Sequence, residues 1–269
     1  MSAAPEAVTR LSRDLAAAAG DLGDDAARFL VDAYYSIQAE RIRADNQVRA
    51  LTEAGEPVAV LDWLAQNART LENQIKRALH RYAKSRAAGE WALAQMGIGP
   101  VLTAGLLAHI DFERAQTAGA IWRFAGLDPS AEWAKGQRRP HNARLKTLCW
   151  KIGESFVKVA NREGAFYGQI YAQRKALENQ RNEAGEFADQ AARKLEKFKI
   201  GKTTDAYKHY AAGQLPPAHI HARAKRYAVK LFLAHLHEIG WRRELKKEPP
   251  MPYAISALEH AHRIDPPSG

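Results

Sequence analysis

Apolar residues recur at alternating three- and four-residue spacing in two neighbouring stretches, and this pattern restricts the fold more than any other feature. Gly55-Glu56-Pro57 separates the stretches, and only Arg41 interrupts the first of them. The apolar positions are Leu30, Tyr34, Ile37, Ala44, Val48 and Leu51, followed by Leu61, Leu64, Ala68, Leu71, Ile75, Ala78 and Tyr82. Such spacing is typical of helices that pack along a seam. The break between them predicts an antiparallel coiled-coil hairpin.

The rest of the chain also favours helices, since no segment shows the alternating pattern of a strand. We expect further helices at 88–95, 101–110, 117–124, after Asn142, at 167–198 and at 217–239, with a loop at 202–214. In the helix after Asn142, the apolar face consists of Leu145, Leu148, Cys149, Ile152 and Phe156. The predicted fold class is all-α, with the hairpin followed by a helix-hairpin-helix-like domain and a helical C-terminal extension.

These elements divide the chain into four predicted regions. The N-terminal helical hairpin covers 1–87, and the helix-hairpin-helix-like domain covers 88–162. A helical extension follows at 163–247, and a proline-rich tail occupies 248–269. No segment repeats at a fixed period, so a solenoid is not expected.

Composition points to a polyanionic partner. Forty lysine and arginine residues against thirty acidic ones leave a formal charge of +10, and 46% of the 269 residues are hydrophobic, enough for a sizeable core. No run approaches the ~18 apolar residues of a membrane-spanning helix, and the N-terminus lacks a signal-peptide pattern. The lone Cys149 allows no internal disulfide. We therefore expect a cytoplasmic protein that binds nucleic acid and no membrane.

A glycine-rich turn supplies the most specific functional pattern. Gly97, Ile98, Gly99 and Pro100 precede an apolar helix, which is the arrangement of a helix-hairpin-helix turn. Both glycines can take positive φ, and Pro100 suits a first helical position. The unpaired amides at the start of that helix can then hold a phosphate without reading base sequence. The alternative interpretation is an ordinary tight turn between two helices.

A basic loop and helix follow this turn. Asn142 is expected to cap the helix, and cations recur on one of its sides and in the loop before it. The residues expected to contact the phosphate backbone are Lys135, Arg138, Arg139, His141, Asn142, Arg144, Lys146 and Lys151, together with the turn. The expected partner is DNA, with RNA as an alternative or additional ligand. A solvated helix face remains the alternative interpretation.

Other chemistry receives little support from the sequence. Three His-x-His pairs occur, at His219 and His221, His235 and His237, and His260 and His262. Residues two apart on a helix face different directions, so we expect no metal site. Phosphate-loop, dinucleotide and nucleophile-elbow motifs are absent from the sequence, which disfavours common metabolic enzymes, and no cofactor is expected.

The Gly97 turn, the segment from Phe124 to Pro129, and the Asn142 and Leu145-Lys146 helix start follow one another in an unusual spacing. Over roughly 90–160 this order resembles the C-terminal domain of the bridge-RNA-guided insertion-sequence transposases, the insertion sequence one-ten family. The preceding hairpin is similar to the coiled coil that comes before this domain in those enzymes.

Two departures from that family bear on catalysis. The resemblance implies an N-terminal ribonuclease H-like domain that holds magnesium, but helices are predicted before residue 90, so Mg²⁺ is expected only if a partner supplies such a domain. The resemblance also implies a serine nucleophile about five residues after Pro129, where this chain has Ala134. Ser130 is the candidate substitute.

The sequence therefore predicts a transposase-related protein that binds nucleic acid through the glycine turn and the basic loop and helix. Two alternatives stay open. The first is a DNA recombinase or transposase that acts with a partner and uses Ser130. The second is an interaction protein whose hairpin forms a homodimer through the coiled coil.

Overall fold

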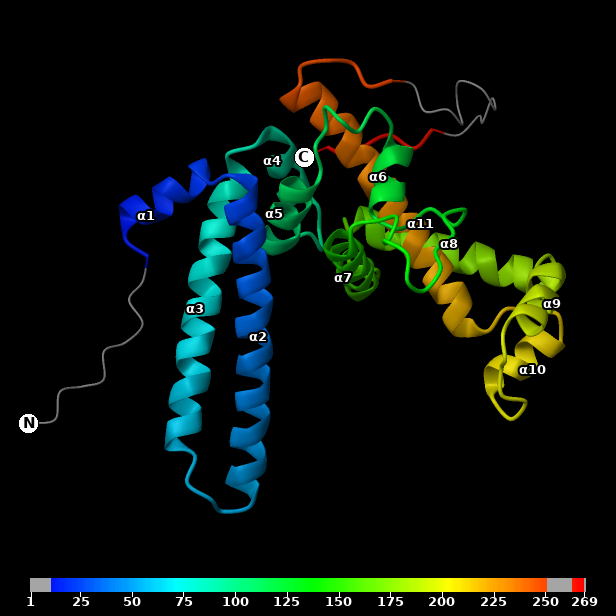
Figure 1. Cartoon of the computed structure of the whole chain (residues 1–269), viewed down its shortest axis with the longest axis horizontal. Helices are drawn as coiled ribbons and strands as arrows, with labels where there is room; N and C mark the ends of the chain where they lie inside the picture. The colour runs from blue at the N-terminus through cyan, green and yellow to red at the C-terminus, as the bar shows by residue number, and fades with distance from the viewer. Residues whose placement is uncertain (1–10, 251–262, 269) are drawn as a thin grey trace, which may run out of the picture.

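The computed structural model describes residues 11–250 and 263–268, and the regular elements within these ranges are all helical (Figure 1). The all-α prediction is confirmed. Two short helices, α1 (Arg13–Ala18) and η1 (Ala19–Asp21), precede the long pair α2 (Asp24–Glu53) and α3 (Ala59–Lys84). The remaining elements are α4 (Ala87–Ala94), α5 (Pro100–His109), α6 (Ala118–Phe124), α7 (Ala143–Val159), α8 (Phe166–Glu183), α9 (Ala188–Lys197), α10 (Asp205–Ala211), α11 (Pro217–Ile239) and η2 (Gly240–Glu244). No helix in the described ranges combines the length and apolar character needed to cross a bilayer.

Helices α2 and α3 lie side by side along the long hairpin in Figure 1, and Gly55 turns the chain between them with φ 77°. The buried side of α3 differs from the predicted stripe. Ala65, Leu79 and Tyr82 are buried, whereas Leu64 and Leu71 are 44% and 40% exposed. The predicted apolar stripe thus runs partly off the surface that faces α2.

A polar layer lies in the hairpin where the apolar stripe is interrupted. Arg41 Nε of α2 donates to Glu72 Oε2 of α3 at 2.7 Å, and Gln38 Nε2 donates to Glu72 Oε1 at 3.0 Å. Burial raises the pKa of Glu72, but the hydrogen bonds from Arg41 and Gln38 outweigh it and hold that pKa below its ordinary value. A paired polar layer of this kind fixes the register of two helices.

The main core joins the base of the hairpin to the helices that follow. Trp91 of α4 stacks on Phe232 of α11 with ring centroids 5.8 Å apart, and Phe156 of α7 meets Phe232 edge-on. Helix α11 packs against α4, α6, α7 and α8. Although α11 belongs to the predicted C-terminal extension, it fills the core of the central helices. The domain boundary at 162 stays a prediction.

Two predictions in the C-terminal part are wrong. The segment 167–198 is not one helix, because the chain breaks between α8 and α9 where Gly185 adopts φ 79°. The segment 202–214 is not a plain loop, because it contains α10. Thr204 caps α10 by accepting from the Tyr207 amide, and Tyr210 packs on a small cluster of Phe187, Leu215 and Ile220.

Candidate nucleic-acid interface

The glycine turn connects α4 to α5, and its two glycines behave differently. Gly97 adopts φ 94°, a conformation that glycine tolerates far better than other residues. Gly99 adopts φ −101° and ψ 175° as the N-cap of α5, so it does not use the positive φ that glycine permits. A Cβ at Gly99 would meet nothing within 4 Å. Positive φ in this turn is therefore required only at Gly97.

The first turn of α5 leaves amides unpaired. Pro100 occupies the predicted first helical position and has no amide hydrogen. The Thr103 amide donates to the Gly99 carbonyl at 3.0 Å, but the Val101 and Leu102 amides have no hydrogen-bond partner among the described residues. These are the orphan donors of a helix N-terminus, where the helix dipole favours an anion.

Helix α7 holds the turn in place. Ser155 Oγ donates a hydrogen bond to the Gly97 carbonyl, and a Cβ at Gly97 would lie 3.3 Å from Val159 Cγ2. Further along, a Cβ at Gly105 of α5 would lie 2.7 Å from Leu148 Cδ1, so α5 and α7 are in close contact there. The turn is therefore part of a packed scaffold.

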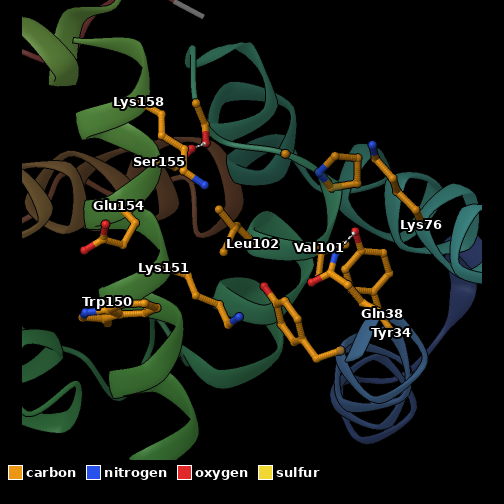
Figure 2. Close-up of a pocket in the computed structure, with 14 residues that line it drawn as sticks. Tyr34, Gln38, Lys76, Val101, Leu102, Trp150, Lys151, Glu154, Ser155 and Lys158 are labelled. Atoms are coloured by element: carbon orange, nitrogen blue, oxygen red, sulfur yellow. Dashed lines mark hydrogen bonds between the residues drawn. The ribbon is translucent and has the colours of Figure 1, made fainter. Parts of the chain in front are cut away.

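The turn, α7 and the base of the hairpin border an open hollow of about 470 Å³, which we call the turn hollow (Figure 2). It is lined by Tyr34, Tyr35, Gln38, Lys76, Gly97, Gly99, Pro100, Val101, Leu102, Trp150, Lys151, Glu154, Ser155 and Lys158. In Figure 2, Lys151 extends from α7 toward the hairpin, while Lys76 lies on the hairpin side of the turn. Three ammonium groups and two unpaired amides thus border one opening.

The basic loop leads into α7, and hydrogen bonds and a glycine turn fix its two ends. The Asn142 amide donates to the Phe124 carbonyl at 2.8 Å, and Asn142 Oδ1 accepts from the Leu145 amide at 3.0 Å, which confirms the predicted cap. Gly126 turns the chain with φ 67°, and a Cβ there would lie 2.9 Å from His141 Cγ. At the exposed tip, Trp133 Nε1 donates to the Gln137 carbonyl at 2.8 Å.

A second hollow of about 530 Å³ lies between this loop and α7, and we call it the loop hollow. It is lined by Trp133, Arg139, His141, Ala143, Lys146, Thr147 and Trp150. Trp150 lines both hollows, so they are neighbours on the same side of α7. The loop hollow contains no acidic side chain in its lining.

The predicted cations fall into two groups. Lys135, Arg138, Arg139 and Lys146 are exposed and form no ion pair with any described residue. Arg144 instead pairs with Asp32 of α2 at 2.7 Å, and Lys151 Nζ lies 3.9 Å from the centroid of the Tyr35 ring. Arg144 therefore forms an exposed ion pair with the hairpin, and Lys151 bridges α7 to it.

The pKa of His141 is affected by the positive charges around the loop hollow. Partial burial lowers the pKa of His141, and the nearby charges of Lys146 and Arg139 lower it further. The imidazole is therefore held neutral at neutral pH, and a bound phosphate would favour its protonated form.

The candidate nucleophile Ser130 is exposed and engaged in a local turn. Its Oγ donates to Asp128 Oδ1 at 2.7 Å, and its amide donates to the same oxygen at 2.9 Å. These hydrogen bonds from Ser130 lower the pKa of Asp128, which also pairs with Arg123. A carboxylate with a lowered pKa is a weak base for activating a hydroxyl. Ala134 lies in the exposed loop.

The histidine pairs of α11 serve other contacts. His219, His221 and His235 hydrogen-bond the hydroxyls of Tyr210, Tyr171 and Tyr167, whereas His237 hydrogen-bonds the Ala115 carbonyl. His260 and His262 lie outside the described residues. Within the described ranges, no group of three histidine, cysteine or acidic side chains is placed to hold a metal ion.

Several lining residues were not predicted from the sequence. Tyr34, Tyr35 and Lys76 come from the hairpin, which lies far from the turn in sequence, so no local pattern places them there. Trp150 could have been found from the sequence, because it falls outside the predicted apolar face of α7. In the structure its side chain is 61% exposed.

The central helices are similar to a known protein family. Residues 90–167 match the family model described as Transposase IS116/IS110/IS902 family. Over these residues the chain is similar to that transposase family. The match runs from α4 through α7 to the start of α8 and confirms the resemblance inferred at 90–160. The chain matches no curated protein and no solved structure. Between residues 11 and 89 the described chain is helical and contains no strand.

Proposed function

We propose that this transposase-related protein binds nucleic acid by holding the phosphate backbone in the turn hollow and along the basic loop and α7. The transposase-family match at 90–167 supports a nucleic-acid partner. The formal charge of +10 supports a polyanion in general. DNA is the expected ligand, and RNA is the alternative that the test below distinguishes.

One observation carries the proposal. The unpaired amides of Val101 and Leu102 border the same hollow as Lys76, Lys151 and Lys158. Amides at a helix N-terminus combined with lysine side chains form a common phosphate site. The hollow is bounded by packed helices, so the donors are held in place before the ligand arrives.

Gly99 offers a graded test, because a side chain there meets open space. Gly99→Ala leaves the amides free and should bind nearly as the native chain does. Gly99→Asn places an N-cap acceptor on one amide, and Gly99→Asp adds a negative charge as well. We expect Gly99→Asn to bind roughly tenfold more weakly than Gly99→Ala, since hydrogen bonds to charged groups contribute about 1.5–3 kcal/mol. Gly99→Asp should lose a further factor of about ten or more in affinity.

The measurement is fluorescence anisotropy of a labelled 20-base-pair DNA duplex, and of RNA and single strands of the same sequence, over a salt titration. Asn and Asp are both better N-caps than Ala, so thermal stability should follow the opposite order to affinity. Equal affinity for the Asp and Ala variants would exclude the turn as a phosphate site. Absence of binding to every polymer would overturn the proposed function.

A second candidate function, self-association through the hairpin, is favoured by an apolar strip on α3. Val60, Trp63, Leu64 and Leu71 are 76%, 50%, 44% and 40% exposed. Exposed apolar patches of this kind mark association surfaces. We propose that this strip contacts a second copy of the chain. Sedimentation at micromolar concentration should show a dimer that Leu64→Lys with Leu71→Lys converts to monomer, and a native monomer would contradict it.

A further inference from the structure

We infer that the loop hollow binds the unpaired base of a single-stranded nucleic acid, which stacks on Trp133 and Trp150. This inference deepens the proposed function, because it names the form of nucleic acid that the same surface prefers. It adds base contact to a surface that otherwise holds only phosphates.

The aromatic content of the loop hollow is its first distinguishing feature. Trp133 and Trp150 are 47% and 61% exposed, whereas Trp91 is fully buried and Trp241 is 9% exposed. Exposed tryptophans in a basic groove are the usual platforms for stacking unpaired bases. The bases of an intact duplex are already stacked on one another and offer no free face to such a platform.

The charge around the two rings favours a nucleotide over an apolar ligand. Arg139, His141 and Lys146 line the hollow with the tryptophans, and no acidic residue does. Arg139 and Lys146 have no ion-pair partner in the described ranges, so their charges remain available to a phosphate. A volume of about 530 Å³ falls within the ~300–1,000 Å³ range of small-molecule sites.

Trp133 is positioned by the loop itself. Its Nε1 donates to the Gln137 carbonyl at 2.8 Å, and the Arg139 guanidinium carbon lies 5.8 Å from its ring centroid. Trp150 is carried by the middle of α7. Because one ring is tethered to the loop and the other to a helix, both are oriented before a base binds, which reduces the entropy cost of stacking.

The loop hollow and the turn hollow form one track along α7. Ala143 lines the first and Lys158 lines the second, a separation of about 22 Å along the helix at 1.5 Å per residue. Roughly six nucleotides at the duplex rise of about 3.4 Å would cover that distance. A single strand of twelve nucleotides is therefore long enough to use both hollows.

The test compares labelled single strands of twelve thymidines and of twelve uridines with a twelve-base-pair duplex, by anisotropy on the full chain. Trp133→Ala and Trp150→Ala should each weaken single-strand binding roughly 5- to 150-fold while weakening duplex binding less than threefold. The salt slope should stay unchanged, since neither variant removes a charge. The two strands distinguish a DNA ligand from an RNA ligand.

Phe198→Ala is the matched control, because Phe198 is 49% exposed but lies at the end of α9 and lines neither hollow. It should bind as the native chain does, and Trp150→Phe should recover most of the single-strand affinity. Equal losses for single strand and duplex, or no loss in either tryptophan variant, would overturn the inference. The proposed function fails separately, when the native chain binds neither the single strands nor the duplex.

Discussion

The two hollows on either side of Trp150 differ in how they are built. The turn hollow is bounded by helices that pack against one another, and its phosphate donors include backbone amides. The loop hollow is bounded on one side by a loop whose residues 129–140 are all exposed, and its lining includes two tryptophans and two cationic residues. The first suits a ligand group that is the same in every nucleotide, and the second suits a base.

The contrast shows how a fold can bind the phosphate backbone at one place and determine ligand preference at another. Backbone amides fixed by α5 and α7 bind phosphate regardless of sequence. Aromatic and basic side chains on a loop can be replaced without disturbing the core, so preference for one ligand can change there at little cost in stability.

The largest effect should come from removing charge in the basic loop and the first turn of α7. Replacing Arg138, Arg139 and Lys146 together with alanine should reduce the slope of log affinity against log salt by up to about 2.7, since each phosphate contact contributes about 0.9. Anisotropy with duplex DNA between 50 and 200 mM salt measures the change. An unchanged slope would remove this group from the interface.

Arg144→Ala provides the matched control for charge. Arg144 lies on the same helix but is paired with Asp32 at 2.7 Å, so its loss should leave the salt slope within about 0.3 of the native value. A reduction as large as that of an unpaired cation would show that the pair opens when nucleic acid binds.

Two glycines of nearly equal φ test whether the turn hollow is packed and the loop hollow open. Gly97 has φ 94° and a Cβ there would lie 3.3 Å from Ser155 Oγ, whereas Gly136 has φ 93° and open space. Gly136→Ala should lose about 1–2 kcal/mol from backbone strain, and Gly97→Ala should lose about 1 kcal/mol more. Thermal unfolding by circular dichroism measures both, and equal losses would contradict the difference.

The smallest effect concerns pH at the loop hollow. Burial, Lys146 and Arg139 hold the pKa of His141 below its ordinary value in the free protein, and a bound phosphate raises it. Affinity should therefore increase as pH falls through that pKa, roughly two- to fivefold more in the native chain than in His141→Gln. The same rise in both proteins would assign the pH dependence to other groups.

In the hairpin, the sequence pattern predicted the helices but not the face along which they pack. The heptad spacing and Gly55-Glu56-Pro57 predicted two long helices and their break, and α2 and α3 follow them closely. The pattern did not identify which side of α3 faces α2. Glu72 lies in that contact because Arg41 pairs with it, and an apolar count cannot anticipate a buried ion pair.

In the candidate site, too, local sequence predicts local features but not contacts between distant segments. Pro100 at the first position of α5 and the Asn142 cap were predictable, because both depend on residues within one helical turn. The sequence could not distinguish the paired Arg144 from the unpaired Lys146, since Asp32 is supplied by a distant helix. The hairpin residues of the turn hollow were missed for the same reason.

Local patterns were enough to predict the helical class, most helix boundaries, the position of the glycine turn and the family resemblance over the central helices. These features depend on local propensity, caps and the spacing of apolar residues. Three features depend on tertiary contacts: which cations stay unpaired, the place of α11 in the central core, and the position of Trp150 between two hollows. Burial and ion pairing are set by contacts between segments far apart in the chain, and no local pattern encodes them.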